Sequence, residues 1–387
     1  MELKPIKQTF SVPYEYQLYF TKGLFHIENT LFYDIVQEYK PQGGVKILFV
    51  IDDGVDYHHK GLRAQIRAYC EKYDSCLTYT DTLVVAGGEQ AKNDNAHVEK
   101  VLLGINANAI CRHSFVVVIG GGAVIDMVGY AAAIAHRGVK LIRIPTTVLS
   151  QNDSAVGVKN SINIFGKKNF LGTFAPPFAI INDQDFLLTL EQRDWISGVS
   201  EAIKVALIKD RAFFDFIAQN AQALKERDRE TMQYLIYKCA EMHMAHIAQG
   251  GDPFEQGSSR PLDFGHWAAH KMEAMTHYTL RHGEAVAKGI ALDVTYAQLL
   301  GLITKKDLDH ILGVMLHIGF DLALPVETPK EQNTLLAGIE EFREHLGGTL
   351  TITLLSDIGK KHDVHTIDES LMLKAMEQLN HQPITNP

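Results

Sequence analysis

Residues 115–129 read FVVVIGGGAVIDMVG, a short apolar run followed by three glycines and a helix-like segment. Apolar, β-branched runs of this length are typical of strands buried on both faces of a parallel sheet. The glycines allow a tight turn, and the N–H groups at the start of the next helix suit a pyrophosphate. The pattern is not the usual G-x-G-x-x-G, so a plain strand–helix turn remains the alternative.

Three similar runs flank this stretch. Residues 46–51 end at Asp52, residues 82–85 lead into Gly87 and Gly88, and residues 141–145 lead into two threonines. Short apolar runs separated by helical stretches indicate a parallel sheet, which binds ligands at the carboxyl ends of its strands. We therefore expect a Rossmann-like α/β domain over residues 1–185. At the end of the first run, Asp52 could bind the hydroxyls of an adenosine ribose. Glu89 and Lys92 could form hydrogen bonds with a ribose and a phosphate.

The pattern changes after residue 185. Helical periodicity is found over 199–224, 231–248, 261–277, 283–300 and 305–318, and only residues 348–355 resemble a late strand or hairpin. We expect a second, mostly α-helical domain over residues 186–387. A cleft between the two halves is the default place for an active site.

Composition argues against several classes of protein. The chain has 387 residues and a formal net charge of −9, which disfavours a general nucleic-acid binder. No run of about 18 apolar residues is present, so we expect no membrane span. The four cysteines form no CxxC pair, and the first residues lack a signal-peptide core. We expect a cytoplasmic protein with reduced thiols.

Three histidines lie close together in the helical half. His266 and His270 are four residues apart, which places them on one face of a helix, and His282 opens the next helical run. Two imidazoles with a carboxylate suit a divalent metal such as zinc. Glu201, in the segment SEAIK with Lys204, is the candidate third ligand. The alternatives are ordinary surface or core histidines, and a Glu201–Lys204 pair that is simply buried.

A polar segment follows the run at 141–145. It contains Asp153, Lys159 and Asn160, and then Gly166-Lys167-Lys168-Asn169. Three lysines and two amides so close together suit a phosphorylated polyol. A solvated loop is the alternative reading.

Six ordered motifs together resemble the dehydroquinate-synthase-like sugar phosphate cyclases. They are GGGxxxDxxG at 120–129, PTTxxxxxDxxVGxK at 145–159, GKKN at 166–169, SEAIK at 200–204, GHxxxH at 265–270 and RHGEAV at 281–286. The resemblance spans roughly residues 45 to 356. Iron-dependent alcohol dehydrogenases and glycerol dehydrogenases share the fold implied but lack the PTT…VGxK…KKN combination.

The resemblance implies cofactors, roles and a homodimer. NAD⁺ would be held by Asp52, Glu89, Lys92, Gly121, Gly122, Asp126, Thr146 and Thr147. A divalent metal, Zn²⁺ or Co²⁺, would bind Glu201, His266 and His282. Catalysis would fall to Asp153, Lys159, Asn169, Lys204 and His270, and substrate binding to Lys168, Asp263 and His345. In such enzymes NAD⁺ transiently oxidises a secondary alcohol, phosphate leaves by β-elimination, the cofactor is regenerated, and an intramolecular aldol reaction closes a carbocycle.

Two positions depart from dehydroquinate synthase. Asp263 stands where that enzyme has Asn, and the segment EFREHLGG at 341–348 brings His345 in place of a lysine. A carboxylate near a carboxylate substrate costs affinity, whereas it can accept hydrogen bonds from hydroxyls. Both changes favour sedoheptulose 7-phosphate as the substrate. The DFGHW form most resembles the 2-epi-valiolone branch and the EboD-like cyclases, with 2-epi-5-epi-valiolone as another product. The alternatives are 3-dehydroquinate synthase and an NAD- and metal-dependent polyol dehydrogenase.

Overall fold

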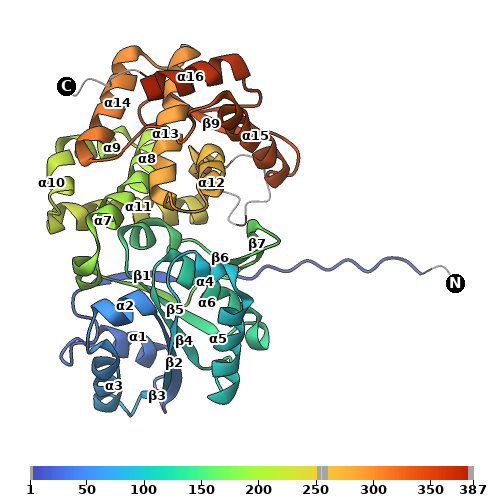
Figure 1. Ribbon diagram of the computed structural model, residues 1–387. Helices are drawn as coiled ribbons and strands as arrows, with labels where there is room; N and C mark the ends of the chain where they lie inside the picture. Colours follow the sequence, from blue (N-terminus) through green and yellow to red (C-terminus); the bar gives the residue numbers. More distant parts are fainter. Residues whose placement is uncertain (1–2, 251–253, 255–259, 382–387) are drawn as a thin grey trace.

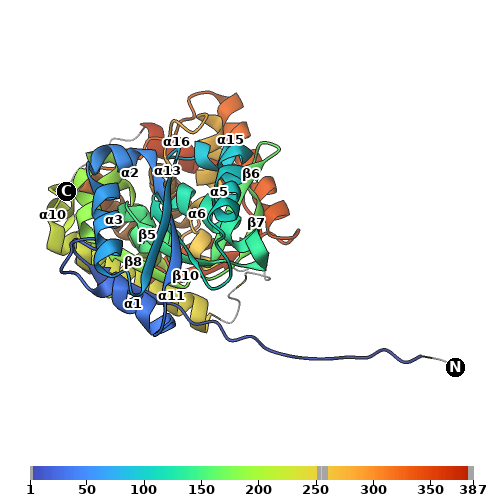
Figure 2. The ribbon, with the colours of Figure 1, turned by 90° about the horizontal axis from the view of Figure 1, so that it is seen from below.

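The computed structural model describes residues 3–250, Phe254 and residues 260–381, and of His345 and His381 it describes the backbone alone. Figure 1 shows an α/β part, blue to green, below a helical part, yellow to red. The segment that begins at residue 3 and precedes β1 extends away from the body of the molecule in both Figure 1 and Figure 2. The expected α/β and α-helical parts are thus confirmed, while a boundary at residues 185 and 186 stays a prediction.

The α/β part is built on a six-stranded parallel sheet in the order β1-β8-β5-β4-β2-β3. The strands are β1 Gln17–Thr21, β2 Val45–Asp52, β3 Leu77–Val85, β4 Phe115–Gly120, β5 Lys140–Pro145 and β8 Ala179–Asp183. Four of the six were predicted, and β1 and β8 were not. The chain leaves β2 toward β3 on one side and returns to β4 on the other. The gap between the carboxyl ends of β2 and β4 is therefore a topological switch point, the usual ligand position in such sheets.

Side chains alternate between the two faces of this sheet, and helices cover both. Ile47, Phe49 and Ile51 of β2 pack with α1 (Leu31–Tyr39) and α3 (Leu62–Lys72), while Leu48 and Val50 pack with α5 (Asn95–Ala107) and α6 (Gly122–Ile134). Burial on both faces explains the unbroken apolar runs in the sequence. Short helices α2 Asp53–His58, α4 Gln90–Asn93, η1 Ala135–Arg137 and η3 Gln184–Thr189 complete this part.

The polar segment after β5 is ordered, so the reading as a solvated loop is wrong. It forms the π-helix η2 (Ser150–Ser154) and a hairpin of β6 (Lys159–Ile164) and β7 (Lys167–Phe174). The fully buried Arg143 of β5 donates to the carbonyls of Ala155 (2.8 Å) and Gly157 (2.5 Å) and to Asn160 Oδ1 (2.7 Å). These long-range contacts hold the segment against the sheet, and no local sequence pattern reports them.

The second part is helical and has one large core. Its elements are α7 Gln192–Ser197, α8 Val199–Lys209, α9 Arg211–Gln219, α10 Ala221–Lys225, α11 Arg229–Gln249, η4 Pro261–Asp263, α12 His266–Met275, α13 His282–Leu299, α14 Lys305–Ile318, α15 Pro329–His345, α16 Glu369–His381 and the hairpin β9 Ile352–Asp357 with β10 Lys360–Val364. The helix expected over 199–224 is instead three helices. Asp210 interrupts it by capping α9, where its carboxylate accepts from Phe213 N at 3.0 Å. Helices α15 and α16 were not predicted. Within the described ranges, no helix is both long and apolar enough to cross a membrane.

Helices α12 and α13 cross very closely near the start of α12. A Cβ on Gly289 would lie 2.0 Å from the carbonyl oxygen of Gly265, which itself adopts φ +79°. The buried carboxylate of Asp293 joins the two helices, because it accepts from Gly265 N and from Trp267 Nε1, both at 2.9 Å. Burial raises the pKa of Asp293 to about 7. This contact fixes the beginning of α12 relative to α13.

Asp293→Ala is expected to lower the free energy of unfolding by about 2–5 kcal/mol, because two buried N–H donors lose their acceptor. Chemical denaturation of the two proteins measures the difference. Asp309→Ala is the matched control, since Asp309 forms only an exposed ion pair with Lys305 and such pairs contribute at most about 1 kcal/mol. Equal stability of Asp293→Ala and Asp309→Ala would contradict the role given to Asp293.

Candidate active site

A carboxylate and two imidazoles meet where α8, α12 and α13 come together. Glu201, His266 and His282 each offer one ligand atom, and these atoms all lie within 4.8 Å of one another. Glu201 Oε1 is 3.7 Å from His266 Nε2 and 3.6 Å from His282 Nε2. Both histidines are the first residues of their helices, and Glu201 is fully buried. The three predicted metal ligands are thus brought together.

The other ring nitrogen of each imidazole is anchored. His266 Nδ1 lies 3.1 Å from the carbonyl oxygen of Phe264, and His282 Nδ1 lies 3.3 Å from Glu273 Oε2. Because both acceptors require a proton on Nδ1, each ring presents an unprotonated Nε2 to the shared point when it is neutral. Burial, together with nearby cationic groups, lowers the pKa of His266 well below its usual value. For His282 burial acts in the same direction, but Glu273 and Glu201 outweigh it and raise the pKa to about 10.

This cluster fits a divalent ion. A tetrahedral zinc ion with bonds of about 2.0–2.1 Å needs ligand atoms about 3.3–3.4 Å apart, and the distances from Glu201 Oε1 are within a few tenths of an ångström of that. In the described part of the chain, Oε1 of Glu201 accepts no hydrogen bond although it is buried. A buried carboxylate oxygen facing two imidazole nitrogens is what a two-histidine, one-carboxylate site requires.

Lys204 extends the site away from the imidazoles. Its ammonium is 2.5 Å from Glu201 Oε2, and the side chains of Lys204 and Glu201 are 3% and 0% exposed. Burial lowers the pKa of Lys204, but Glu201, Asp153 and Asp263 outweigh it, so that the pKa is raised. For Glu201 burial by itself raises the pKa, but Lys204 and His282 outweigh it and lower the pKa to about 2. The buried ammonium of Lys204 is therefore stabilised by the carboxylates of Glu201, Asp153 and Asp263.

Asp153 lies in the π-helix η2 and has a partner that sequence analysis missed. Its Oδ1 is 2.9 Å from Nδ1 of His243, which comes from α11. Burial and Glu201 raise the pKa of Asp153, but Lys204 and His243 outweigh them and lower it. His243 is three residues before His246 in the run EMHMAH, a spacing that was the only sequence signal for it.

Most residues expected to hold NAD⁺ lie at the switch point of the sheet. The carboxylate of Asp52 accepts from Gly54 N at 2.8 Å and Val55 N at 3.3 Å. A Cβ on Gly87 would lie 2.6 Å from Asp52 Oδ1, so a larger residue there would displace this carboxylate. Gly121 caps the N-terminus of α6, which Gly122 begins, and the side chain of Thr147 approaches Gly121. Glycines and a free helix N-terminus at this edge make room for a pyrophosphate.

Lys92 and Asp126 differ from the expectation of simple cofactor contacts. The ammonium of Lys92 is buried and lies 2.6 Å from Asp126 Oδ2, 3.0 Å from Ser161 Oγ and 2.5 Å from Asn169 Oδ1. These bonds join α4, α6 and both strands of the β6–β7 hairpin. In this structure Lys92 therefore holds the hairpin in place, and its contact with NAD⁺ stays a prediction.

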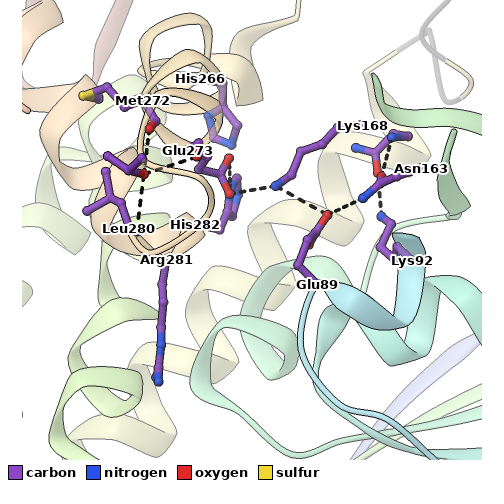
Figure 3. A network of polar contacts seen from close by, with 12 residues as sticks. Glu89, Lys92, Asn163, Lys168, His266, Met272, Glu273, Leu280, Arg281 and His282 are labelled. Carbon is purple, nitrogen blue, oxygen red and sulfur yellow. Dashed lines mark hydrogen bonds and ion pairs between the residues drawn. The ribbon is translucent and has the colours of Figure 1, made fainter. Parts of the chain in front are cut away.

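A second chain of contacts crosses from the hairpin to the helical part (Figure 3). Lys168 Nζ is 2.7 Å from Glu273 Oε1 of α12 and 3.6 Å from Glu89 Oε1. Asn163 Nδ2 donates to Glu89 Oε1 at 2.8 Å. The opposite halves of the molecule thus meet through Lys168. Glu273 was not predicted from sequence, and a single glutamate in a helix gives no distinctive signal.

The remaining predicted residues are distributed around these groups. His270 is exposed, and its ring centroid lies 5.5 Å from that of His266 and 5.9 Å from that of His282. Lys159 begins β6 with an exposed side chain, Thr146 is buried, and Asp263 ends η4 just before the metal cluster. The side chain of His345 lies outside the described part of the structure.

Comparisons with known proteins match this arrangement. The profile described as "3-dehydroquinate synthase N-terminal" covers residues 82–197, and "3-dehydroquinate synthase C-terminal" covers residues 198–340. A 3-dehydroquinate synthase of Shewanella sp. (strain MR-4) is 35% identical over 292 residues, 75% of this chain and 80% of that protein. The structure of ValA, a 2-epi-5-epi-valiolone synthase from Streptomyces hygroscopicus subsp. jinggangensis 5008 with NAD⁺ and Zn²⁺ bound, has a TM-score of 0.86 at 27% identity and covers 97% of this chain and 99% of ValA. A 2-deoxy-scyllo-inosose synthase with carbaglucose-6-phosphate, NAD⁺ and Co²⁺ shares the fold, with a TM-score of 0.76, 21% identity, and coverage of 93% and 96%.

Proposed function

Because this chain belongs to the 3-dehydroquinate synthase family, we propose that it is an NAD- and metal-dependent sugar phosphate cyclase that acts on sedoheptulose 7-phosphate. The product would be a C7 cyclitol, 2-epi-valiolone or 2-epi-5-epi-valiolone, formed with release of phosphate. The likeness to ValA, a 2-epi-5-epi-valiolone synthase, in both fold and coverage supports a product of the valiolone type. The six ordered motifs and the cluster of Glu201, His266 and His282 support the chemistry.

Two groups would bind at the sites described. Zn²⁺ or Co²⁺ would bind to Glu201, His266 and His282. NAD⁺ would bind at the switch point of the sheet, where Asp52, Gly121 and Gly122 lie. The metal would polarise the substrate oxygens, and NAD⁺ would transiently oxidise a secondary alcohol, so that the neighbouring C–H becomes acidic. ValA and 2-deoxy-scyllo-inosose synthase carry this pair of cofactor types in their structures.

The side chains of this protein would bind and orient the two ends of the substrate. Lys168, Asn169 and His270 lie on the hairpin and α12, and would bind the phosphate together with Lys159. Lys204 would stabilise negative charge on the substrate oxygens beside Glu201, as a buried ammonium does most strongly in a site that excludes water. Asp153, anchored by His243, would accept hydrogen bonds from substrate hydroxyls.

The charges around Lys204 support the choice of substrate, because Asp263 adds to the negative charge that raises the pKa of this ammonium. Together with Glu201 and Asp153, three carboxylates act on the ammonium of Lys204. A substrate carboxylate placed among them would be repelled, whereas hydroxyl groups would be accepted. The charges near Lys204 therefore favour a hydroxymethyl ketone over a carboxylic acid.

Incubation of the protein with sedoheptulose 7-phosphate, NAD⁺ and Zn²⁺ tests the proposal. Release of phosphate, with a cyclitol identified by NMR and no net accumulation of NADH, is the expected result. The comparison reaction uses the carboxylate-bearing C7 sugar phosphate that dehydroquinate synthase cyclises. Activity confined to that acid would make the protein a 3-dehydroquinate synthase, the second candidate, which the 35% identity to such enzymes favours. NADH formed in proportion to product would indicate a polyol dehydrogenase instead.

Asp263→Asn is expected to shift substrate preference toward the carboxylate-bearing sugar phosphate. Loss of one negative charge near Lys204 removes a repulsion of about 1–2 kcal/mol, which corresponds to a change of about 5- to 30-fold in the ratio of kcat/KM values. The ratio is measured by phosphate release with both substrates. Asp309→Asn, on the exposed surface of α14, is the control and should leave the ratio unchanged. An unaltered ratio in Asp263→Asn would contradict the charge argument.

A further inference from the structure

Glu273 is a buried carboxylate whose two oxygens have different partners. It lies in the middle of α12 and is 3% exposed. Oε2 is 3.3 Å from Nδ1 of His282, and Oε1 is 2.7 Å from Nζ of Lys168. Burial raises the pKa of Glu273, but His282 and Lys168 outweigh it and hold the pKa far below its usual range. One carboxylate is therefore shared by two site residues (Figure 3).

The contact with His282 has a direct consequence for metal binding. An imidazole that binds a metal through Nε2 is oriented by the acceptor of its Nδ1–H, and a carboxylate acceptor also makes the ring a stronger ligand. His266 has only a backbone carbonyl, that of Phe264, in the same place. His282 is also the more exposed of the two rings, 32% against 9%. Glu273 therefore contributes more to the orientation of His282 than the carbonyl of Phe264 contributes to that of His266.

The contact with Lys168 places the same carboxylate on the other side of the site. Lys168 belongs to β7, and its ammonium also lies 5.2 Å from the centroid of the Tyr278 ring. Burial lowers the pKa of Lys168, but Glu273 and Glu89 outweigh it and raise the pKa. A protonated Lys168 is thereby held at the metal-proximal end of the hairpin.

We propose that Glu273 is a positioning residue that orients His282 for the metal and at the same time holds the ammonium of Lys168 at a fixed place relative to His282. One carboxylate would then set the separation between the metal and the cation that binds the substrate phosphate. The inference rests on the metal site of the proposed function. In this proposal Glu273 touches neither the metal nor the substrate. It acts through His282, which would bind the metal, and through Lys168, which would bind the substrate phosphate.

Glu273→Gln tests this role without a large change in shape. Glutamine offers one acceptor oxygen and one NH₂ group, so either His282 or Lys168 faces a donor in place of an acceptor. Affinity for Zn²⁺, measured by competition with a chromophoric chelator and without substrate, is expected to fall about 10- to 100-fold. The visible spectrum of the Co²⁺ form is expected to change as well, which a merely structural role of Glu273 would not cause. Thermal unfolding of the metal-free variant shows whether the fold is kept.

Glu284→Gln is the matched control. Glu284 is two residues from His282, but its carboxylate binds Arg193 and the backbone N–H of Arg281 instead of the imidazole. It should retain the Zn²⁺ affinity of the wild type within about threefold. An equal fall in both variants, or none in Glu273→Gln, would overturn the positioning role while leaving the proposed function intact. Failure of the wild-type protein to bind Zn²⁺ would overturn the metal site and this inference together.

Discussion

His282→Ala is expected to abolish cyclisation and to leave the purified protein with little bound metal. The substitution removes one of three ligand atoms that lie within 4.8 Å of one another. Two protein ligands do not complete a catalytic zinc site, which ordinarily has three and an open position. We expect kcat/KM with sedoheptulose 7-phosphate to fall at least about 1,000-fold, equivalent to about 4 kcal/mol of lost transition-state stabilisation.

Metal content after dialysis and the rate of phosphate release measure these two effects separately. His317→Ala is the control, because His317 is an exposed histidine of α14 that contacts Gln222 outside the site. Circular dichroism shows whether the variants keep their helices. Full metal occupancy in His282→Ala would remove this residue from the ligand set. If the fully metal-loaded variant were also inactive, His282 would be assigned to substrate binding.

Strands buried on both faces were the easiest elements to predict. Apart from the exposed Lys46, the runs at 46–51 and 115–119 are apolar at every position, because helices cover both sides of the sheet there. The edge strand β1 reads QLYFT and is only partly buried, so its sequence carries no such run. The hairpin of β6 and β7 was read as a polar segment because its residues are ordered by Arg143 and Lys92, which are distant in sequence.

The cluster of Glu201, His266 and His282 could be predicted from the sequence, but two of the residues that contact these side chains and Asp153 could not. His266, His282 and Glu201 stand in motifs whose order and spacing carry information. Glu273 lies 3.3 Å from His282 through the packing of α12 on α13, and His243 lies 2.9 Å from Asp153 through the packing of α11 on η2. Positioning residues of this kind look like ordinary helix residues in the sequence.

Lys204→Met is expected to destabilise the metal-free protein by about 3–5 kcal/mol, the usual cost of leaving a buried charge without its partner. Glu201 is fully buried, and the ammonium of Lys204 lies 2.5 Å from its Oε2. Methionine fills a similar volume but removes the nearest positive charge from Glu201, with Asp153 also nearby, and leaves the more distant His282 on the other oxygen. Loss of the buried ammonium that we propose to stabilise charge on the substrate oxygens should lower kcat/KM at least about 1,000-fold as well.

Zinc should recover much of the stability lost in Lys204→Met but not the activity. A divalent cation on Glu201, His266 and His282 would compensate the charge that Lys204 compensates in the metal-free protein. Urea denaturation of wild type and variant, each with a chelator and with excess Zn²⁺, gives four free energies of unfolding. The difference between the two proteins should be clearly smaller with Zn²⁺ than with the chelator. Lys209→Met, on the same helix but outside this cluster, serves as the control for the side-chain change. If the difference were the same in both conditions, the metal would not be compensating Glu201, and Lys204 and the metal would act on separate charges.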